Sequence, residues 1–547
     1  MSRPTTNSEL ILAGALLAGA LVLGLSTAAD YGISIDEFNA DDYGPKALAW
    51  YTSGFTDRSH FETVEFSLWY YGPWFHMLTA AVQTLDLADR FTVRHAMTFL
   101  VGLGGLAALY PIGRLAVGRW AGLTAIVLCL MTGYLYGSLF FTPIDVPFLA
   151  AMSWATLAIL VMTRETLPSW RSTIVAGLAT GLAIGTRTGG IITHAYLLGA
   201  LALCAAELFA ASGRLPARYL WQLGARYAAV VGTAWLTAMA LWPWLQVGNP
   251  FNQFVIALRH FATIPMAYEF SHWGERIRTD ALPASYIPGQ LAGRLPDAFL
   301  LLLIVAFFGA AVALAALTRD LVAKRRIDRR VGLRALMMAL ARKRAILVVS
   351  AAAVLPIAFL ILQGAKIYDG VRHVLFVIPM LAIIAGAGFS MILPLVRRVA
   401  LIFAVAAGLY VGHVVATLAR LHPLEYIAMN SLAGGTHGAA NRFELDYFSV
   451  AATEAVRRLE GQLAYDPAAQ SGEVLRSIHI CITWRESVIG PMLKGPWTIE
   501  TDPAKADVVI ETERSHCAVG PRLTLIDEVK RFGRSFAWTF VRGAEAR

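Results

Sequence analysis

The sequence predicts a mostly α-helical, polytopic membrane protein with interfacial helices and a small exoplasmic α/β domain at its C-terminal end. Of its 547 residues, 57% are hydrophobic and only 15% are charged, whereas a soluble protein carries roughly 25% charged residues. The apolar residues form blocks long enough to cross a bilayer. After about residue 420 these blocks give way to shorter β-branched and aromatic segments, which are typical of strands.

The net charge of +9 does not indicate a nucleic-acid-binding protein. The basic residues lie in short loops between the apolar blocks, where the positive-inside rule places them. We therefore expect membrane lipids, and no nucleic acid, among the partners of this chain.

By the length rule the sequence predicts about eleven membrane-spanning helices. The expected spans are 10–28, 96–117, 121–139, 147–162, 173–185, 191–211, 227–245, 298–317, 345–362, 374–393 and 399–418. The first is too long for the apolar core of a signal peptide and is expected to be retained. The fifth is short and is expected to be tilted or broken near its glycines.

The distribution of arginine and lysine predicts the orientation. With the N-terminus in the cytoplasm, the basic loops fall on the cytoplasmic side, and the strongest signal is the run from Arg319 to Arg344. The loops rich in acids and aromatics, residues 31–94 and 246–297 among them, then fall on the exoplasmic side. Binding of anionic lipid by the basic run is a secondary possibility.

The first exoplasmic loop, residues 31–94, contains two amphipathic, aromatic-rich stretches, PKALAWYTSGF and YYGPWFHMLTAAVQTL. They are typical of helices that lie in the membrane interface. Pro45 suits the first turn of the first of these helices, with Asp41 or Asp42 as its cap.

The region 420–547 is predicted to form the exoplasmic α/β domain. FELDYFSVAATEAVRRLE is expected to be a helix after a turn, SIHICITW, ADVVIET and SFAWTFVR to be strands, and LIDEVKRFGRSFAWTF to be two strands around a glycine turn. Cys481 and Cys517 could pair if this region faces an oxidising compartment.

The acids Asp36 and Glu37 follow the first span within a few residues. A carboxylate at this depth can reach an aqueous acceptor and a lipid phosphate, and it can act as a general base if its pKa is raised. Asp145 lies between apolar residues in FFTPIDVPF, where a lone acid is costly without a partner or a function. The alternatives are a solvated or capping role for Asp36, and helix capping assisted by Pro147 for Asp145.

Cations on the predicted exoplasmic side indicate phosphate binding. Arg187 lies in the turn GLAIGTRTGG, and the stretch KIYDGVRH contains Lys366, Tyr368, Asp369, Arg372 and His373. Such cations can bind a lipid-linked phosphate and stabilise it as a leaving group. The alternative is interfacial snorkelling.

The loop 246–297 is expected to cover the substrate, with His272 as a candidate contact. His272 and Glu275 could form a metal pair, but no further ligand spacing supports a metal site. The sequence contains no P-loop, no GxGxxG before a helix, no GxSxG and no HExxH.

Five stretches together resemble the GT-C membrane glycosyltransferases, and more narrowly the protein O-mannosyltransferase family (glycosyltransferase family 39) and its bacterial relatives such as the aminoarabinose transferase. The stretches are SIDEFNADDYG, YYGPWFHML, FFTPIDVPF, KIYDGVRHVLFVIP and SLAGGTHGAANRFELDYFSVAATEAVRRL. The resemblance implies a GT-C catalytic module over residues 1–419. The chain shows no insertion like the MIR module of eukaryotic members, which favours a bacterial enzyme of the inner membrane.

The resemblance also implies residue roles. Asp36 would be the catalytic base with Glu37 in support, and Asp145 would position the acceptor or the sugar. Arg187, Lys366 and Arg372, with His373, would hold the donor phosphate, and Tyr368, Asp369 and His272 would belong to the substrate loop. No cofactor or metal would be required, and a divalent metal is possible but has no support in the sequence.

The function expected from these observations is transfer of a hexosyl or pentosyl group from a polyprenyl-phosphate donor to a lipid, glycan or protein acceptor on the exoplasmic side, with inversion. The alternative is a secondary transporter or lipid flippase, which should carry ionisable residues in mid-span and paired broken helices. A binding or assembly scaffold leaves the acidic cluster unexplained.

Overall fold

The computed structural model describes residues 8–62, 67–262, 267–463, 476–481, 490–495, 497–517 and 523–542. Its longer helices are α1 (Ser8–Thr27), α2 (Ile35–Thr52), α3 (Trp74–Gln83), α4 (Arg90–Ala107), α5 (Leu109–Ala116), α6 (Arg119–Met131), α7 (Gly133–Phe141), α8 (Asp145–Met162), α9 (Trp170–Ile184), α10 (Thr193–Ser212), α11 (Ala217–Leu241), α12 (Pro250–Ala262), α13 (Tyr286–Arg294), α14 (Asp297–Ile327), α15 (Arg329–Arg342), α16 (Arg344–Leu362), α17 (Ile378–Arg398), α18 (Ala400–Leu421) and α20 (Ala451–Leu463). The strands are β1 (Glu269–His272), β2 (Glu275–Arg278), β3 (Arg476–Ile480), β4 (Trp497–Ile499), β5 (Val508–Thr512), β6 (Leu523–Arg531) and β7 (Arg534–Arg542).

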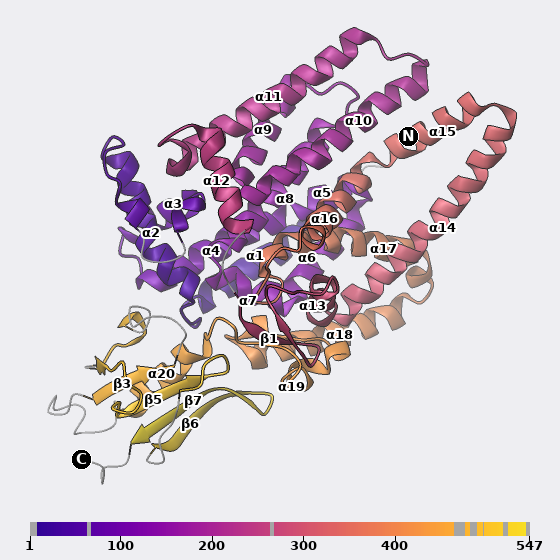
Figure 1. Cartoon of the computed structure of the whole chain (residues 1–547). Helices are drawn as coiled ribbons and strands as arrows, with labels where there is room; N and C mark the ends of the chain where they lie inside the picture. Colours follow the sequence, from indigo (N-terminus) through magenta and orange to yellow (C-terminus); the bar gives the residue numbers. More distant parts are fainter. Residues whose placement is uncertain are drawn as a thin grey trace.

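The helices form one large bundle, with the C-terminal sheet at one end and the α14–α15 hairpin projecting at the other (Figure 1). Within the described residues, eight helices are long and apolar enough to cross a membrane. The pair α6 and α7, bent by 71°, is a ninth candidate. The prediction of a polytopic, mostly helical membrane protein is therefore confirmed.

Each of the eleven predicted spans coincides with helix, but two of these helices, α9 and α11, do not combine the length and the apolarity needed to cross a membrane. α9 has only 15 residues, as the short predicted span 173–185 suggested. α11 has 25 residues but begins with basic and polar side chains. These two helices pack against each other, and Gly181 of α9 has no room for a Cβ because the carbonyl oxygen of Ala234 on α11 occupies its place.

The predicted basic loops lie together at one end of the bundle. Arg119 pairs with Glu9 at the start of α1, at 2.9 Å. Arg344 pairs with Glu207 at 2.9 Å and donates a hydrogen bond to the carbonyl of Arg164. This gathering of loops that are distant in the sequence is the arrangement that alternating spans require.

Helix α2 begins at Ile35 because Ser34 caps it. The Ser34 hydroxyl accepts from the Glu37 amide (3.3 Å), and the Glu37 carboxylate accepts from the Ser34 amide (3.0 Å), which completes a capping box. The expected start near Pro45 is wrong: Pro45 lies inside the helix. Reading Ser-Ile-Asp-Glu as a capping box would have found the true start. Asp36 thus lies in the first helical turn, where the helix dipole favours a negative charge.

We expect Ser34→Ala to lower the free energy of unfolding by about 1–2 kcal/mol, because it removes the cap and the hydrogen bond that the Ser34 hydroxyl donates to the Phe141 carbonyl at 2.7 Å. Thermal unfolding of the purified protein in detergent measures this loss. Ser34→Thr, which keeps the hydroxyl, is the control. Equal melting temperatures for wild type and Ser34→Ala would contradict the role of the cap.

The aromatic segment before α3 reaches α9 through a close backbone contact at Gly72. A Cβ at Gly72 would collide with the carbonyl oxygen of Gly185, and the Gly72 amide donates to the Thr186 carbonyl at 3.2 Å. Only glycine allows the two backbones to approach this closely. The contact places Tyr71 beside Arg187.

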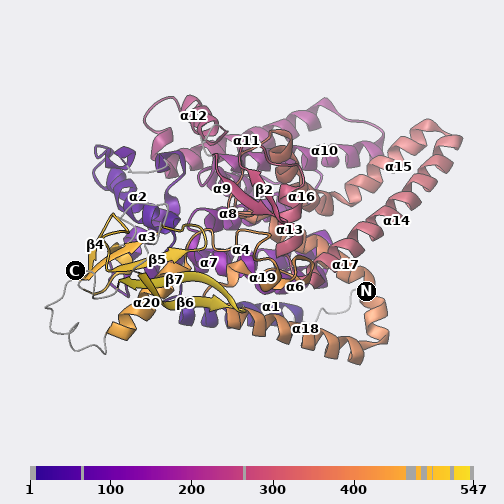
Figure 2. The same cartoon turned by 60° about the horizontal axis from the view of Figure 1, so that its bottom comes forward.

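The C-terminal sheet has five strands in the order β4-β3-β5-β7-β6. β3 is parallel to β4 and β5, whereas β7 is antiparallel to both of its neighbours. α20 packs on this sheet beside the ends of α1 and α18 (Figure 2). The predicted helix and strands are confirmed, including the β6–β7 hairpin, whose turn residues Phe532 and Gly533 have positive φ. The part of the predicted strand after Cys481 lies outside the described residues.

Candidate functional site

A cavity of about 590 Å³ lies where α2, α8, the β1–β2 hairpin and the segment before α17 meet the C-terminal sheet domain. Its polar lining comes from segments that are far apart in the sequence. The charged residues and histidines are Asp36, Asp145, Arg187, His260, Glu269, Asp369, Arg372, His373, Glu444 and Arg514. Tyr71, Phe261, Tyr268 and Tyr368 are its aromatic lining residues.

Two acid–arginine pairs dominate the cavity. Arg372 Nη1 lies 2.7 Å from Asp36 Oδ2, and Arg187 forms a short ion pair with Asp145. All four side chains are at most 16% exposed. Each charge therefore has a partner, as buried charges require, and each still faces the cavity. The Asp145 carboxylate forms an ion pair with Arg187, and no described side chain caps the start of α8. The alternative of a purely capping role for Asp145 therefore does not fit its contacts.

Burial raises the pKa of Asp36 above its ordinary value, and Arg372 opposes this shift. The nearby carboxylates of Asp145 and Asp369 add to the rise, whereas Arg187 lowers it. A carboxylate with a raised pKa is a better proton acceptor than an ordinary aspartate. Asp36 thus has the electrostatic environment of a general base.

The YDG stretch forms a tight turn that carries Asp369 into the centre of the charge network. Asp369 and Gly370 both adopt positive φ values, 58° and 68°, a conformation that aspartate tolerates and glycine favours. Asp369 Oδ2 lies 3.4 Å from Arg372 Nε, and its Oδ1 accepts a hydrogen bond from the Tyr268 hydroxyl at 3.1 Å. The turn therefore orients Arg372 through Asp369.

Aromatic rings cover the guanidinium groups. Arg187 lies over Tyr71 (5.5 Å to the ring centroid) and Arg372 over Tyr368 (5.1 Å). Such contacts stabilise a cation in a poorly hydrated place. The rings leave the arginines rigid and partly desolvated, which suits binding of an anionic group.

Three residues that the sequence placed in the site do not line the cavity in the described part of the chain. Glu37 caps α2, and its Oε1 lies 3.0 Å from His95 Nε2. His272 is buried against Tyr286 and Phe443 and contacts Gln290 at 3.1 Å. Lys366 precedes the YDG turn but is absent from the lining. Asp36, Asp145, Arg187, Tyr368, Asp369, Arg372 and His373 are brought together.

Sequence reasoning missed the contribution of the C-terminal sheet domain and of the segment that precedes it. Arg514 lies 3.1 Å from Asp369 Oδ1, and its Nε lies 3.6 Å from Glu444 Oε1. Tyr268, under the Arg514 guanidinium at 5.2 Å, was also missed. Arg514 follows a buried strand by only two residues, but this pattern alone does not show where the strand lies relative to the membrane helices.

Burial raises the pKa of Glu444 to about 7, although Arg514 opposes the shift, and burial likewise raises the pKa of Asp446 to about 7. Because the unfolded chain releases these protons near pH 4, the folded state binds more protons between about pH 4 and pH 7. The contribution of these two carboxyls to the free energy of unfolding therefore falls as the pH rises through this window and levels off above it.

We expect Glu444→Gln to remove the share of this decline that comes from Glu444. That share is at most about 3 kcal/mol of the free energy of unfolding over the whole pH window. Thermal unfolding in detergent between about pH 4.5 and pH 8 measures the slope. Glu275→Gln, on the exposed end of β2, is the matched control and should keep the wild-type slope. An unchanged slope in Glu444→Gln would contradict the raised pKa.

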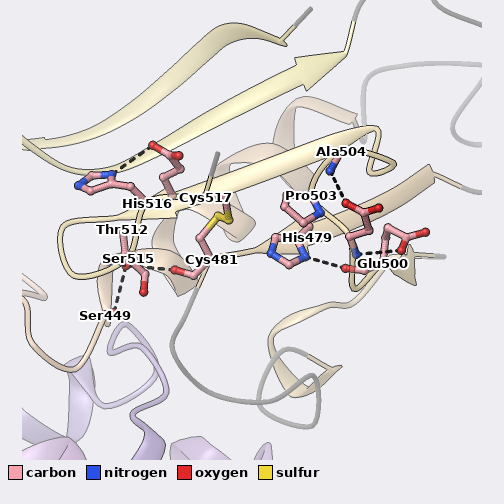
Figure 3. Close-up of a disulfide and its surroundings, with 12 residues drawn as sticks. Ser449, His479, Cys481, Glu500, Pro503, Ala504, Thr512, Ser515, His516 and Cys517 are labelled. Carbon is pink, nitrogen blue, oxygen red and sulfur yellow. Dashed lines mark hydrogen bonds and ion pairs between the residues drawn. A yellow bond between two sulfur atoms is a disulfide. The ribbon is translucent and has the colours of Figure 1, made fainter. Parts of the chain in front are cut away.

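The carboxylates in the cavity could attract a divalent cation, but Asp36, Asp145 and Asp369 each already contact an arginine. Among the described residues, one group has metal-ligand spacing: His479, Cys481 and Cys517. Cys481 and Cys517 are joined in a disulfide (Figure 3). None of the three lines the cavity, so the structure offers no separate metal centre next to it within the described ranges.

No family model matches the chain, and no curated protein matches it by sequence. Several solved structures are similar. ArnT from Cupriavidus metallidurans bound to undecaprenyl phosphate is 14% identical, with coverage of 99% of both chains and a TM-score of 0.47. The Archaeoglobus fulgidus oligosaccharyltransferase is 13% identical, covers 92% of this chain and 68% of its own, and has a TM-score of 0.42. The S. cerevisiae protein O-mannosyltransferase Pmt1-Pmt2 complex bound to the sugar donor is 14% identical. The match covers 49% of this chain and 39% of the yeast chain, with a TM-score of 0.34.

Proposed function

We propose that the protein is a membrane glycosyltransferase that moves a sugar from a polyprenyl-phosphate donor to an acceptor hydroxyl or phosphate. One observation carries the proposal: the pairs Asp36–Arg372 and Asp145–Arg187 face a single cavity. Sugar transfer from a lipid phosphate needs a base and a cation for the departing phosphate. The cavity supplies both, and it lies at the end of the bundle away from the clustered basic loops.

Arg372, Arg187 and His373 form the proposed phosphate site. A guanidinium donates two parallel hydrogen bonds to a phosphate, which fixes the position of the leaving group. His373 supports this assignment, because its Nδ1 is buried without a hydrogen-bond partner among the described residues. A buried polar atom of this kind in a cavity wall is suited to a polar ligand.

Asp36 is the proposed base. It accepts the proton of the acceptor hydroxyl as the acceptor oxygen attacks the anomeric carbon. The bond between that carbon and the phosphate oxygen breaks, and the phosphate leaves with the electron pair toward Arg372 and Arg187. Attack from the side opposite the phosphate inverts the anomeric centre. Asp145, held by Arg187, positions the sugar or the acceptor, and Glu37 keeps the first turn of α2 in place.

The bilayer determines the geometry of this reaction. A lipid-linked donor enters from the membrane, and an acceptor reaches the cavity from the aqueous side or from the same leaflet. We assign the cavity and the C-terminal sheet domain to the periplasmic face of a bacterial inner membrane, because the basic loops then face the cytoplasm. The transferred group is a hexose or pentose, and the acceptor is a lipid, a glycan or a protein.

The test is sugar transfer by purified protein in liposomes with a panel of polyprenyl-phosphate sugars. We expect release of free polyprenyl phosphate from at least one donor when acceptor lipids or glycans are present. Turnover that requires Asp36 establishes the donor class and the base together. Movement of the intact donor between leaflets, with no release of polyprenyl phosphate by folded protein, would overturn the proposal in favour of a lipid flippase.

A further inference from the structure

An unbroken chain of alternating charges connects the C-terminal sheet domain to Asp36. Arg514 contacts Asp369 at 3.1 Å, Asp369 contacts Arg372 at 3.4 Å, and Arg372 contacts Asp36 at 2.7 Å. Glu444 continues the chain outward, 3.6 Å from Arg514. The members come from four regions that are far apart in the sequence, so only the docked C-terminal domain completes the chain.

We propose that Arg514 is a positioning residue, supplied by the C-terminal sheet domain, which acts through Asp369 to hold Arg372 on Asp36. Asp369 has two oxygens and two arginine partners: Oδ1 faces Arg514 and Oδ2 faces Arg372. Without Arg514, Asp369 keeps the hydrogen bond from the Tyr268 hydroxyl but loses one of its two arginine partners, so more of its negative charge acts on Arg372. Arg372 is then drawn toward Asp369 and away from Asp36.

The backbone around Arg514 is fixed in a way that suits this role. Thr512 and Ser515 exchange backbone hydrogen bonds of 3.1 and 3.2 Å and form a tight turn with Arg514 near its tip. Glu513, the preceding residue, forms an ion pair with Arg534 and accepts a hydrogen bond from the Asp446 amide at 2.8 Å. The arginine is therefore presented from a braced turn.

The disulfide adds a covalent brace to the same turn. Cys517, three residues after Arg514, is bonded to Cys481 at the end of β3, and Thr512 donates a hydrogen bond to the Cys481 carbonyl at 3.3 Å (Figure 3). A cross-link between a strand end and a loop limits how far the loop can move. The turn that carries Arg514 is thus tied to the sheet at both of its ends.

Removal of Arg514 also changes the electrostatics around Asp36. The charged and titratable groups that face Asp36 are Arg372, Asp369, Asp145, Arg187 and Tyr368. Those that face Asp369 include Arg372, Arg514, Tyr268 and Glu444, together with Asp36, Tyr286, Tyr368 and Tyr447. Asp369 raises the pKa of Asp36 and Arg372 lowers it. Loss of the Arg514 charge leaves Asp369 less neutralised, so the pKa of Asp36 must rise further.

The experiment compares wild type with Arg514→Gln, Arg514→Lys and Arg531→Gln. Arg531 is the matched control because it is similarly buried (9% against 13% exposed) and also fastens the C-terminal domain, through the carbonyls of Leu421 and His422, but it does not line the cavity. We expect Arg514→Gln to lower kcat/KM at neutral pH roughly 2- to 30-fold and to move the acidic limb of the pH–rate profile to higher pH. Arg514→Lys keeps the positive charge, so it should shift the acidic limb less than Arg514→Gln does.

Arg531→Gln is expected to lower the melting temperature and to leave the position of the acidic limb unchanged. Equal pH profiles for Arg514→Gln and wild type would overturn the proposal, as would the same shift in Arg531→Gln. The Cys481→Ser/Cys517→Ser variant should move the limb in the same direction as Arg514→Gln. An unmoved limb would remove the disulfide from the proposal.

This inference rests on the proposed role of Asp36, so a second readout that needs no turnover accompanies it. The infrared C=O band of protonated Asp36, assigned by its loss in Asp36→Asn, titrates with pH in the resting protein. A higher midpoint in Arg514→Gln than in Arg531→Gln supports the coupling even if no donor is turned over. Equal midpoints would overturn the coupling while leaving a positive transfer assay intact.

Discussion

Asp36→Asn is expected to reduce sugar transfer about 10²- to 10⁴-fold, the contribution of a positioned general base. Asparagine keeps the size of the side chain and can still contact Arg372, but it cannot take up the acceptor proton. Asp36 lies between Ser34 and Glu37, the two residues of the capping box, and its side chain takes no part in the cap. Helix α2 should therefore form as in wild type. Membrane insertion and donor binding should therefore survive while turnover is lost.

Asp42→Asn is the matched control for this loss. Asp42 lies in the same helix, pairs with Lys46 at the surface with 37% exposure, and is absent from the cavity lining in the described residues. Such surface pairs contribute little, so transfer should stay within about two-fold of wild type. Undiminished turnover by Asp36→Asn would remove Asp36 from the mechanism, and equal losses in both variants would indicate a structural effect on α2.

Arg372→Gln is expected to produce the largest combined effect on binding and stability. Loss of a charge-assisted hydrogen bond to phosphate should weaken donor binding roughly 10- to 100-fold. The variant also leaves Asp36 without its cation. Removal of one partner of a buried ion pair lowers the free energy of unfolding by about 3–5 kcal/mol. Both partners are at most 15% exposed, so solvent offers little compensation.

A double-mutant cycle separates these two effects. The variant Asp36→Asn/Arg372→Gln removes the pair as a unit, so it should be more stable to thermal unfolding than Arg372→Gln alone, while donor binding stays weak. Arg278→Gln, which breaks a half-exposed pair with Asp280 on the hairpin, should change neither. Full donor affinity in Arg372→Gln, measured by binding of polyprenyl phosphate in detergent, would exclude Arg372 from the phosphate site.

The distribution of charge in the bundle bears on the transporter alternative. The ionisable residues of α4, Arg90, Arg94 and His95, lie in its first turns and contact Asp41 or Glu37 of α2. These ion pairs tie the first turns of α4 to the interfacial helix and do not form a path along the span. An ion-coupled carrier would place its charges near the middle of broken helices. The arrangement is better suited to chemistry at one face of the membrane.

The sequence by itself determined the features that depend on local composition. Apolar blocks predicted the helices, because backbone groups in a bilayer must be satisfied within one segment. Motifs predicted six of the ten charged residues and histidines that line the cavity. Asp36, Asp145, Arg187 and the YDGVRH residues lie at the ends of apolar segments, where a charged side chain is informative. Four of the five strands of the C-terminal sheet, all but β4, were likewise predicted from their β-branched and aromatic residues.

Only the tertiary structure decided which of these charged residues meet. Asp36 and Glu37 are adjacent in sequence, yet the turn of α2 directs Asp36 to the cavity and Glu37 to His95, since neighbouring helical residues point in different directions. His272 lies in a loop that is also rich in polar and aromatic residues, but its ring packs against Tyr286 and Phe443 and does not line the cavity. Arg514 reaches Asp369 across 145 residues because the sheet domain packs on the end of the bundle. Such contacts depend on long-range packing, which hydropathy and motif spacing do not encode.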